Sequence, residues 1–329
     1  MMTSPLGDTV PSQYRSRLPA DLMGRIASAR RRSLIAVCAQ CLTVVCVGFL
    51  VGLVFALVLG AFFGEIFSLV WGLSRIRVEA LIVLVIGGVF FVVYLPWLVY
   101  IALRRNTILL RQLGARDAND AEESRLTNVL EEVSVAAGIR PLPLQVIDDR
   151  APNGFIVGST SAPQIVVTSG LLQITERDEL EAVVGHLVGR AVGGDLRYAS
   201  LLAGNVTALA YLMQSSPVLA LPALLCYFPA TLVTRLVSKE RVLLADHVGV
   251  LLVRNPEALV HALEKIYRDP NEASGLPRDM AMLAFVDPQY PAAMAGPAGA
   301  RARPWSDDKG SPLHPPLKKR VERLRVLYA

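Results

Sequence analysis

The hydrophobic pattern is dominated by two long apolar stretches near the N-terminus. Residues 33–63 and residues 80–103 contain no charged side chain. A helix crosses a bilayer in roughly 20 residues, so the pattern predicts a transmembrane hairpin of two spans over residues 33–103. The first stretch is too long, and begins too late in the chain, for a cleaved signal peptide.

A third apolar block covers residues 199–236 and predicts a second hairpin. Each half is close to the lower length limit for a span, and three prolines interrupt the second half, at Pro217, Pro222 and Pro229. Two arrangements remain open: the block crosses the bilayer, or it packs against the bilayer or the folded domain.

Between and after these blocks, the pattern alternates between helical and strand periods. The spacing predicts a helix over residues 121–138 ending at Gly138, and short strands at 144–148 and 164–168. Thr175 and Asp178 predict a capping box that opens a helix from Glu176 to about Val192. Further helices are expected at residues 238–253, 255–267 (capped by Asn255) and 314–327, with a long loop at 269–312.

Composition and charge place these elements at a membrane. Hydrophobic residues make up 53% of the 329, mean hydropathy is +0.45 and the net charge is +5. Arginines flank the predicted hairpin before residue 33 and after residue 103, which puts the basic N-terminus (residues 1–32) and the later domain in the cytoplasm of a multi-pass plasma-membrane protein. This clustering argues against nucleic acid as a partner. The four cysteines lie in apolar runs and predict no disulfide framework.

Six segments, in order, carry a resemblance over residues about 120–325. They are APNGFIVG with QIVVTSGLL, RDELEAVVGH, GGDLR, SKERVLLAD, NPEALVHALEKI and HPPLKKRVERL. In these segments the chain resembles the HtpX-like membrane metallopeptidases, relatives of the CAAX prenyl endopeptidases. The resemblance implies an α-helical membrane protein with a cytoplasmic zincin-like domain, α+β and mostly helical. This domain would cover residues 104–329, interrupted by the apolar hairpin at 199–236.

The family site, as the resemblance implies it, uses two histidines on one helix and a later glutamate to hold zinc, with a second glutamate activating the bound water. On this chain His186 falls on the first ligand position, and Asp246 falls on the position that orients that histidine. Leu187 stands at the position of the base, Arg190 at the second histidine and Val242 at the third ligand. The resemblance also assigns residues Asn153, Gly154 and Phe155 to the edge of the substrate cleft, where an extended peptide would pair.

These substitutions predict a loss of chemistry. A protein zinc site draws roughly 10–16 kcal/mol from a full ligand set, and a protonated guanidinium at Arg190 repels a cation. Glu240 and His247 point elsewhere on their helix, His261 suits a surface or core position, and His314 suits a structural or cleft-lining role. We therefore expect no cofactor, with zinc only if an atypical ligand set exists.

The resulting functional hypothesis is a catalytically degenerate pseudo-peptidase. It would serve as a scaffold, adaptor or complex subunit in membrane-protein quality control, with an integral membrane protein or an extended peptide segment as partner, besides the bilayer. The alternative is an active zinc-dependent metalloendopeptidase with an atypical ligand set. For Arg190 two environments are considered: solvent, or a filled site in which Asp246 pairs with Arg190 or His186.

Overall fold

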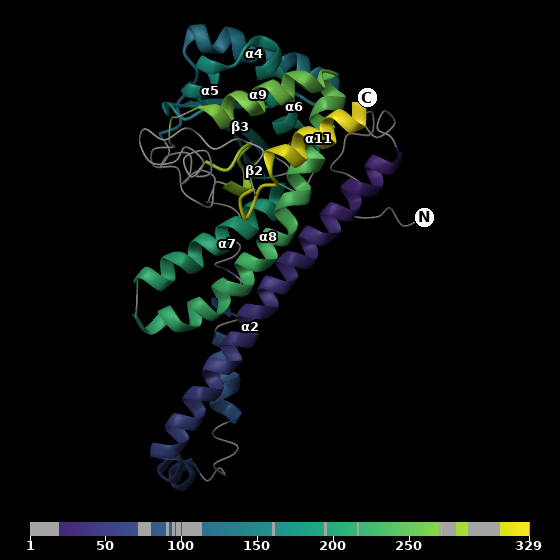
Figure 1. The fold of residues 1–329 in the computed structure, drawn as a ribbon. Coiled ribbons are helices and arrows are strands. Elements are labelled where there is room, and N and C mark those ends of the chain that lie inside the picture. The colour runs from purple at the N-terminus through teal and green to yellow at the C-terminus, as the bar shows by residue number, and fades with distance from the viewer. Residues whose placement is uncertain are drawn as a thin grey trace.

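The computed structural model describes residues 20–71, 80–89, 92, 93, 96, 100, 114–159, 162–193, 196–215, 217–269, 271, 281–288 and 310–328. A mostly helical domain with a small sheet lies at one end of a set of long helices (Figure 1). The elements are α2 (Ala20–Trp71), α4 (Asp120–Ala137), β1 (Leu144–Ile147), β2 (Gly154–Ser159), β3 (Ala162–Thr168), α5 (Ser169–Ile174), α6 (Arg177–Gly193), α7 (Leu196–Ser215), α8 (Pro217–Val253), α9 (Pro256–Arg268) and α11 (Leu317–Tyr328).

Two helices are long and apolar enough to cross a membrane, by length and composition. Their apolar stretches are Gly24–Val54 in α2 and Ala220–Val253 in α8. Helix α2 has 52 residues and begins before the predicted span. Its first turns belong to the folded domain, because Ile26 is buried in the main core. Of the second predicted span, the structure describes an apolar helix at Ala80–Val89 and a few single residues; the remainder lies outside the described residues.

The apolar block at 199–236 forms a helical pair, α7 and the first half of α8, and both helices pack along α2 (Figure 1). The expectation that prolines interrupt the second half was wrong. Helix α8 runs unbroken from Pro217 through Pro222 and Pro229 to Val253, so it also contains the separately predicted helix at 238–253. Pro217 suits a first helical position, and each internal proline removes one backbone hydrogen bond, which packing against neighbouring helices offsets.

A buried polar cluster ties these three helices together within their apolar length. The amide of Gln40 on α2 donates to the Ala230 carbonyl oxygen at 3.2 Å and to the Thr234 hydroxyl at 3.3 Å, both on α8. Asn205 on α7 donates to the side-chain oxygen of Gln40 at 3.0 Å. Because an unpaired amide among apolar side chains is costly, these bonds fix how α2, α7 and α8 meet.

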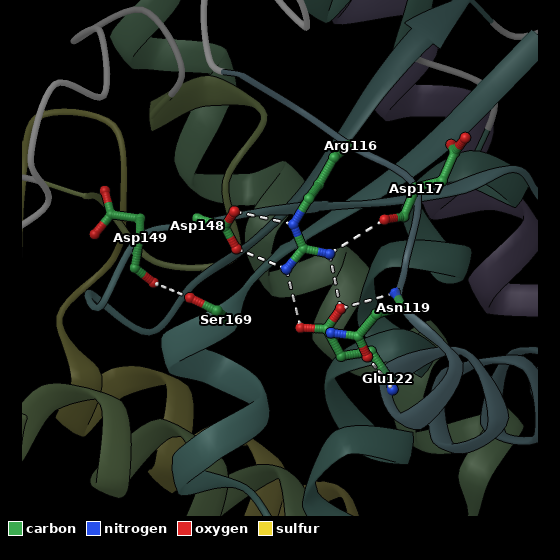
Figure 2. Close-up of polar contacts among 7 residues, drawn as sticks. All are labelled: Arg116, Asp117, Asn119, Glu122, Asp148, Asp149 and Ser169. Carbon is green, nitrogen blue, oxygen red and sulfur yellow. Dashed lines mark hydrogen bonds and ion pairs between the residues drawn. The ribbon is translucent and has the colours of Figure 1, made fainter.

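The sheet has the strand order β1-β3-β2, with β1 parallel and β2 antiparallel to β3. Figure 2 shows how Arg116 joins its β1 edge to α4: the guanidinium contacts Asp148 at 2.6 Å and Glu122 at 2.8 Å. Glu122 and Asn119 also form the capping box of α4, which ends at Gly138 with φ +66°, as the sequence predicted. The sheet and α4 therefore form one unit.

Helix α6 lies at the centre of the domain, against α4, β2, α8 and α9. Its predicted extent is confirmed to within a residue at each end, but the predicted cap is not. The Thr175 hydroxyl donates to the Leu171 carbonyl oxygen of α5, and the Glu179 carboxylate accepts from the Glu176 amide instead. The last carbonyl group of α6 accepts from Arg30 of α2 at 2.7 Å, which joins the membrane helix to the central helix.

Candidate functional site

The centre of the candidate site is the crossing of α6 and α8. A Cβ atom at Gly249 would lie 2.7 Å from the His186 backbone nitrogen, so only glycine permits this approach. Asp246, about one turn earlier on α8, is thereby placed opposite His186. The His186 Nδ1 and Asp246 Oδ1 atoms are 2.7 Å apart, and both side chains are almost fully buried. The hypothesis that Asp246 pairs with His186 agrees with this geometry.

The second partner of Asp246 is Arg320 of α11, which the sequence analysis did not identify. Its guanidinium donates to both carboxylate oxygens, at 2.8 and 2.7 Å, and to the Phe285 carbonyl oxygen at 3.0 Å. Arg320 is fully buried and also lies over the Phe285 ring. A signal was present in the sequence: Arg320 falls at helical spacing between Leu317 and Leu324, on the face of α11 that is buried.

The ring of His186 is oriented and neutral. Burial lowers the pKa of His186 to about 4, and the neighbouring Asp246 offsets only part of that shift. Nδ1 is directed at the carboxylate, so Nδ1 carries the proton and Nε2 presents a lone pair. Nε2 is buried and has no hydrogen-bond partner, which makes it the available acceptor of the site.

Arg190 lies one turn after His186 and is buried, with 4% of its surface exposed. Its guanidinium donates to the carbonyl oxygens of Met282 and of Ala284, the latter at 3.2 Å. The expectation of a solvent-directed side chain was therefore wrong. The proposed pairing with Asp246 was wrong as well, because Arg320 holds that carboxylate and Arg190 is turned toward the backbone of residues 281–288.

His314 closes the same region from the segment before α11. Its Nε2 atom donates to the Ala284 carbonyl oxygen at 3.2 Å, so that oxygen receives both Arg190 and His314. Burial lowers the pKa of His314 to about 3, with Arg320 adding to the effect. The predicted structural or cleft-lining role agrees with this position. Its Nδ1 atom is buried without a partner.

The predicted cleft edge is paired with the chain itself. The Gly154 carbonyl oxygen accepts from the Phe285 amide at 2.8 Å, and the Ile156 amide donates to Leu283 at 3.0 Å. Asn153 holds the same segment through two bonds to the Val286 backbone. Phe155 is fully buried and forms a β-bridge with Ala284. This part of the predicted loop at 269–312 is therefore a buried irregular segment with one β-bridge, and the apolar run AMLAFV was the signal of its burial.

The family's zinc ligand set does not fit the residues present. Val242 and Leu187 are buried hydrocarbon, and the Leu187 methyl group would lie 3.0 Å from a Cβ atom at Gly154. Glu240 is exposed and paired with Arg32, and His261 is exposed. Within the described residues, no group of three or more histidine, cysteine, aspartate or glutamate side chains is placed to hold a metal ion. Of the family's three protein ligands, His186 alone remains.

Comparison with known proteins decides the family. Residues 120–327 match the sequence profile described as Peptidase family M48. The chain belongs to peptidase family M48. A relative named "Protease HtpX homolog" from Dictyoglomus turgidum is 31% identical over 246 residues, covering 68% of this chain and 76% of the relative. Another of the same name, from Thermoanaerobacter pseudethanolicus, is 28% identical over 297 residues, covering 82% of this chain and 89% of the relative. No solved structure matches. The chain is thus an HtpX-like member of the M48 family.

The hypothesis of a catalytically degenerate scaffold is contradicted by these comparisons. The family and its relatives are named as peptidases and proteases, which supports the alternative of an active enzyme. The hypothesis depended on counting zinc ligands. It gave no weight to the oriented lone pair of His186 or to the donors that converge on Ala284.

Proposed function

We propose that this chain is a membrane-bound endopeptidase that hydrolyses extended peptide segments of membrane proteins, in membrane-protein quality control. It would work as a multi-pass protein of the plasma membrane, with its N-terminus and M48 domain in the cytoplasm. Family membership supports the reaction type, and the flanking arginines support the orientation. The observation that carries the proposal is the oriented His186, whose neutral Nε2 is available as a proton acceptor.

The substrate segment would take the place of residues 283–285 along β2. The main-chain groups of Gly154 and Ile156 already bind the backbone of Phe285 and Leu283 there, and an extended peptide in the same register would find the same two bonds. Its carbonyl oxygens would meet the guanidinium of Arg190 and the imidazole of His314. Access therefore requires the chain's own segment to leave this edge.

The groups left facing such a peptide suit hydrolysis. Two donors that converge on one carbonyl oxygen, as Arg190 and His314 do on Ala284, stabilise the negative charge that forms there when water adds. His186 Nε2 accepts the proton of the attacking water, and Asp246 stabilises the imidazolium that results. The imidazolium then returns this proton to the leaving amine as the C–N bond breaks and the carbonyl group re-forms. The second carboxylate partner, Arg320, keeps Asp246 ionised and in place.

The test uses full-length protein in detergent, with casein and a peptide library as substrates. We expect cleavage that falls at least 100-fold in His186→Ala, because loss of a proton acceptor costs roughly 10²–10⁴ in rate. His261→Ala is the matched control, since His261 is exposed on α9 and should leave the rate unchanged. Assays with added zinc and with chelator, beside the measured zinc content, determine whether an atypical metal site contributes.

Two results would contradict the proposal. One is the absence of cleavage by the wild-type protein in every metal condition. The other is cleavage that persists in His186→Ala at the wild-type rate, which would indicate a contaminating protease or a different reaction centre.

A further inference from the structure

A basic cavity lies where α2, α8 and α11 meet, away from His186. Its lining includes Arg25 and Arg32 of α2, Glu240 and Leu244 of α8, and Arg323 of α11. The cavity measures about 190 Å³. That is more than ten times the roughly 10–15 Å³ that a single water molecule requires.

The charges around this cavity do not balance. Three guanidinium groups face it against the single carboxylate of Glu240, and that carboxylate already accepts a hydrogen bond from Arg32. Arg25 and Arg323 come from helices far apart in the sequence, and both helices pack on α8 (Figure 1). Arginine groups that converge on a cavity are suited to a phosphate group, which their planar donors bind in pairs.

The cavity adjoins the start of the apolar stretch of α2. Arg32 directly precedes the uncharged residues 33–63 of α2, and Arg25 lies seven residues earlier, about 10 Å along the helix axis. The headgroup layer on each side of a bilayer is roughly 5–8 Å thick. The mouth of the cavity near Arg32 is therefore within reach of a lipid headgroup, and Leu244 supplies an apolar wall.

We propose that this cavity binds the phosphate of an anionic membrane lipid. The lipid phosphate joins Arg25 on the membrane helix to Arg323 on α11. Helix α11 also carries Arg320, the partner of Asp246, so an occupied cavity stabilises the helix that completes the site. The bound group is a phosphate monoanion or diester; a free phosphate ion shares that chemistry, and the experiment separates the two sources.

The experiment measures binding to the full-length protein in detergent by native mass spectrometry and by the shift in melting temperature. The probes are short-chain phosphatidylglycerol, short-chain phosphatidylcholine and inorganic phosphate. We expect phosphatidylglycerol to bind at least tenfold more tightly than phosphatidylcholine. The double variant Arg25→Gln/Arg323→Gln should lose at least tenfold in that affinity, because it removes two guanidinium groups that would donate charge-assisted hydrogen bonds to the phosphate.

A matched control removes the same charge from the same two helices. Arg31→Gln/Arg325→Gln changes two exposed arginines that do not line the cavity, and its affinity should stay within about twofold of wild type. Glu240→Gln gives the opposite sign: it removes the single carboxylate and should tighten phosphatidylglycerol binding severalfold. A gain of affinity cannot result from misfolding.

Three outcomes would overturn the inference. Equal affinity for the two lipids would show no preference for an anionic headgroup. Equal losses in the two double variants would indicate a general basic surface instead of a site. Inorganic phosphate binding as tightly as phosphatidylglycerol would assign the cavity to a soluble ligand. None of these measurements uses proteolysis, so they stand or fall independently of the peptidase assay.

Discussion

Two buried arginines lie near His186, and the structure holds them differently. On the side of α11, Arg320 pairs with both oxygens of Asp246. On the side of α6, Arg190 donates to the backbone carbonyl oxygens of Met282 and Ala284. The Asp246–Arg320 pair joins α8 to α11, and Arg320 adds one bond to the Phe285 carbonyl oxygen. Both of these Arg190 bonds go to the segment that pairs along the edge of β2.

This difference separates a permanent part of the site from an exchangeable one. A buried carboxylate cannot lose its guanidinium without a large cost, so Asp246, Arg320 and His186 stay together. Carbonyl oxygens are offered by any extended peptide, so the Arg190 side can bind another segment in the same way.

The largest expected effect comes from breaking the permanent side. Arg320→Ala leaves Asp246 ionised and buried without its guanidinium, and should lower the free energy of unfolding by about 3–5 kcal/mol. Urea denaturation of detergent-purified protein measures it. Arg325→Ala on the same helix is the control, because Arg325 is exposed and should change stability by less than about 1 kcal/mol. Equal losses in the two variants would refute the distinction.

A smaller effect is expected on the exchangeable side. Arg190→Met keeps an unbranched side chain but removes the donors to the carbonyl oxygens of residues 282 and 284. It should lower the free energy of unfolding by about 1–3 kcal/mol. Amide hydrogen exchange at residues 283–285 should speed up more than exchange in α6. Arg177→Met, at an exposed position on α6, is the control. Unchanged exchange at 283–285 would show that Arg190 does not hold this segment.

Acidification provides the third test, through the buried neutral histidines, and its effect is spread over two pH units. The pKa of His314 is about 3 in the folded protein, against an ordinary value of 6.5, so the unfolded chain takes up a proton first as the pH falls. Stability should therefore be full above pH 6.5 and decline below it. Between pH 7 and pH 5, this histidine should lower the free energy of unfolding by about 2 kcal/mol.

The pH test compares His314→Gln with the exposed His261→Gln. Thermal melting between pH 7 and pH 5 should show a shallower decline for His314→Gln and the wild-type decline for His261→Gln. The decline in melting temperature that remains in His314→Gln includes the contribution of His186, whose pKa burial also lowers, to about 4. Identical slopes in all three proteins would mean that His314 titrates normally and is accessible to water.

Much of the local structure followed from local patterns. The end of α4 at Gly138, the start of α9 at Asn255 and the strands β1 and β3 needed no more than capping rules and β-rich composition. Strand β2 was not predicted. Helix α8 was predicted less well. Its prolines predicted an interruption, but the helix is continuous because packing against neighbouring helices stabilises it. The role of Thr175 was also predicted wrongly. This residue lies between α5 and α6 and can cap either helix, and its hydroxyl bonds to α5.

The sequence predicted which residues occupy the family's site positions, but it did not predict which side chains and backbone groups they contact. His186 and Asp246 were found by motif, because the segments RDELEAVVGH and SKERVLLAD place them at the family's positions. The roles of Arg320, His314 and the segment 281–288 arise from contacts between residues 30 or more positions apart in the sequence. No local pattern specifies such contacts.

The sequence by itself determined the long apolar stretches, the family landmarks and the substitutions at the zinc positions. These properties depend on composition and on spacing within one element. Only the tertiary structure decided that Arg190 turns to the backbone, that Asp246 is held by Arg320, and that β2 is covered by the chain's own segment. The physical reason is that a buried charge takes the partner that packing brings within reach, and packing is a property of the whole fold.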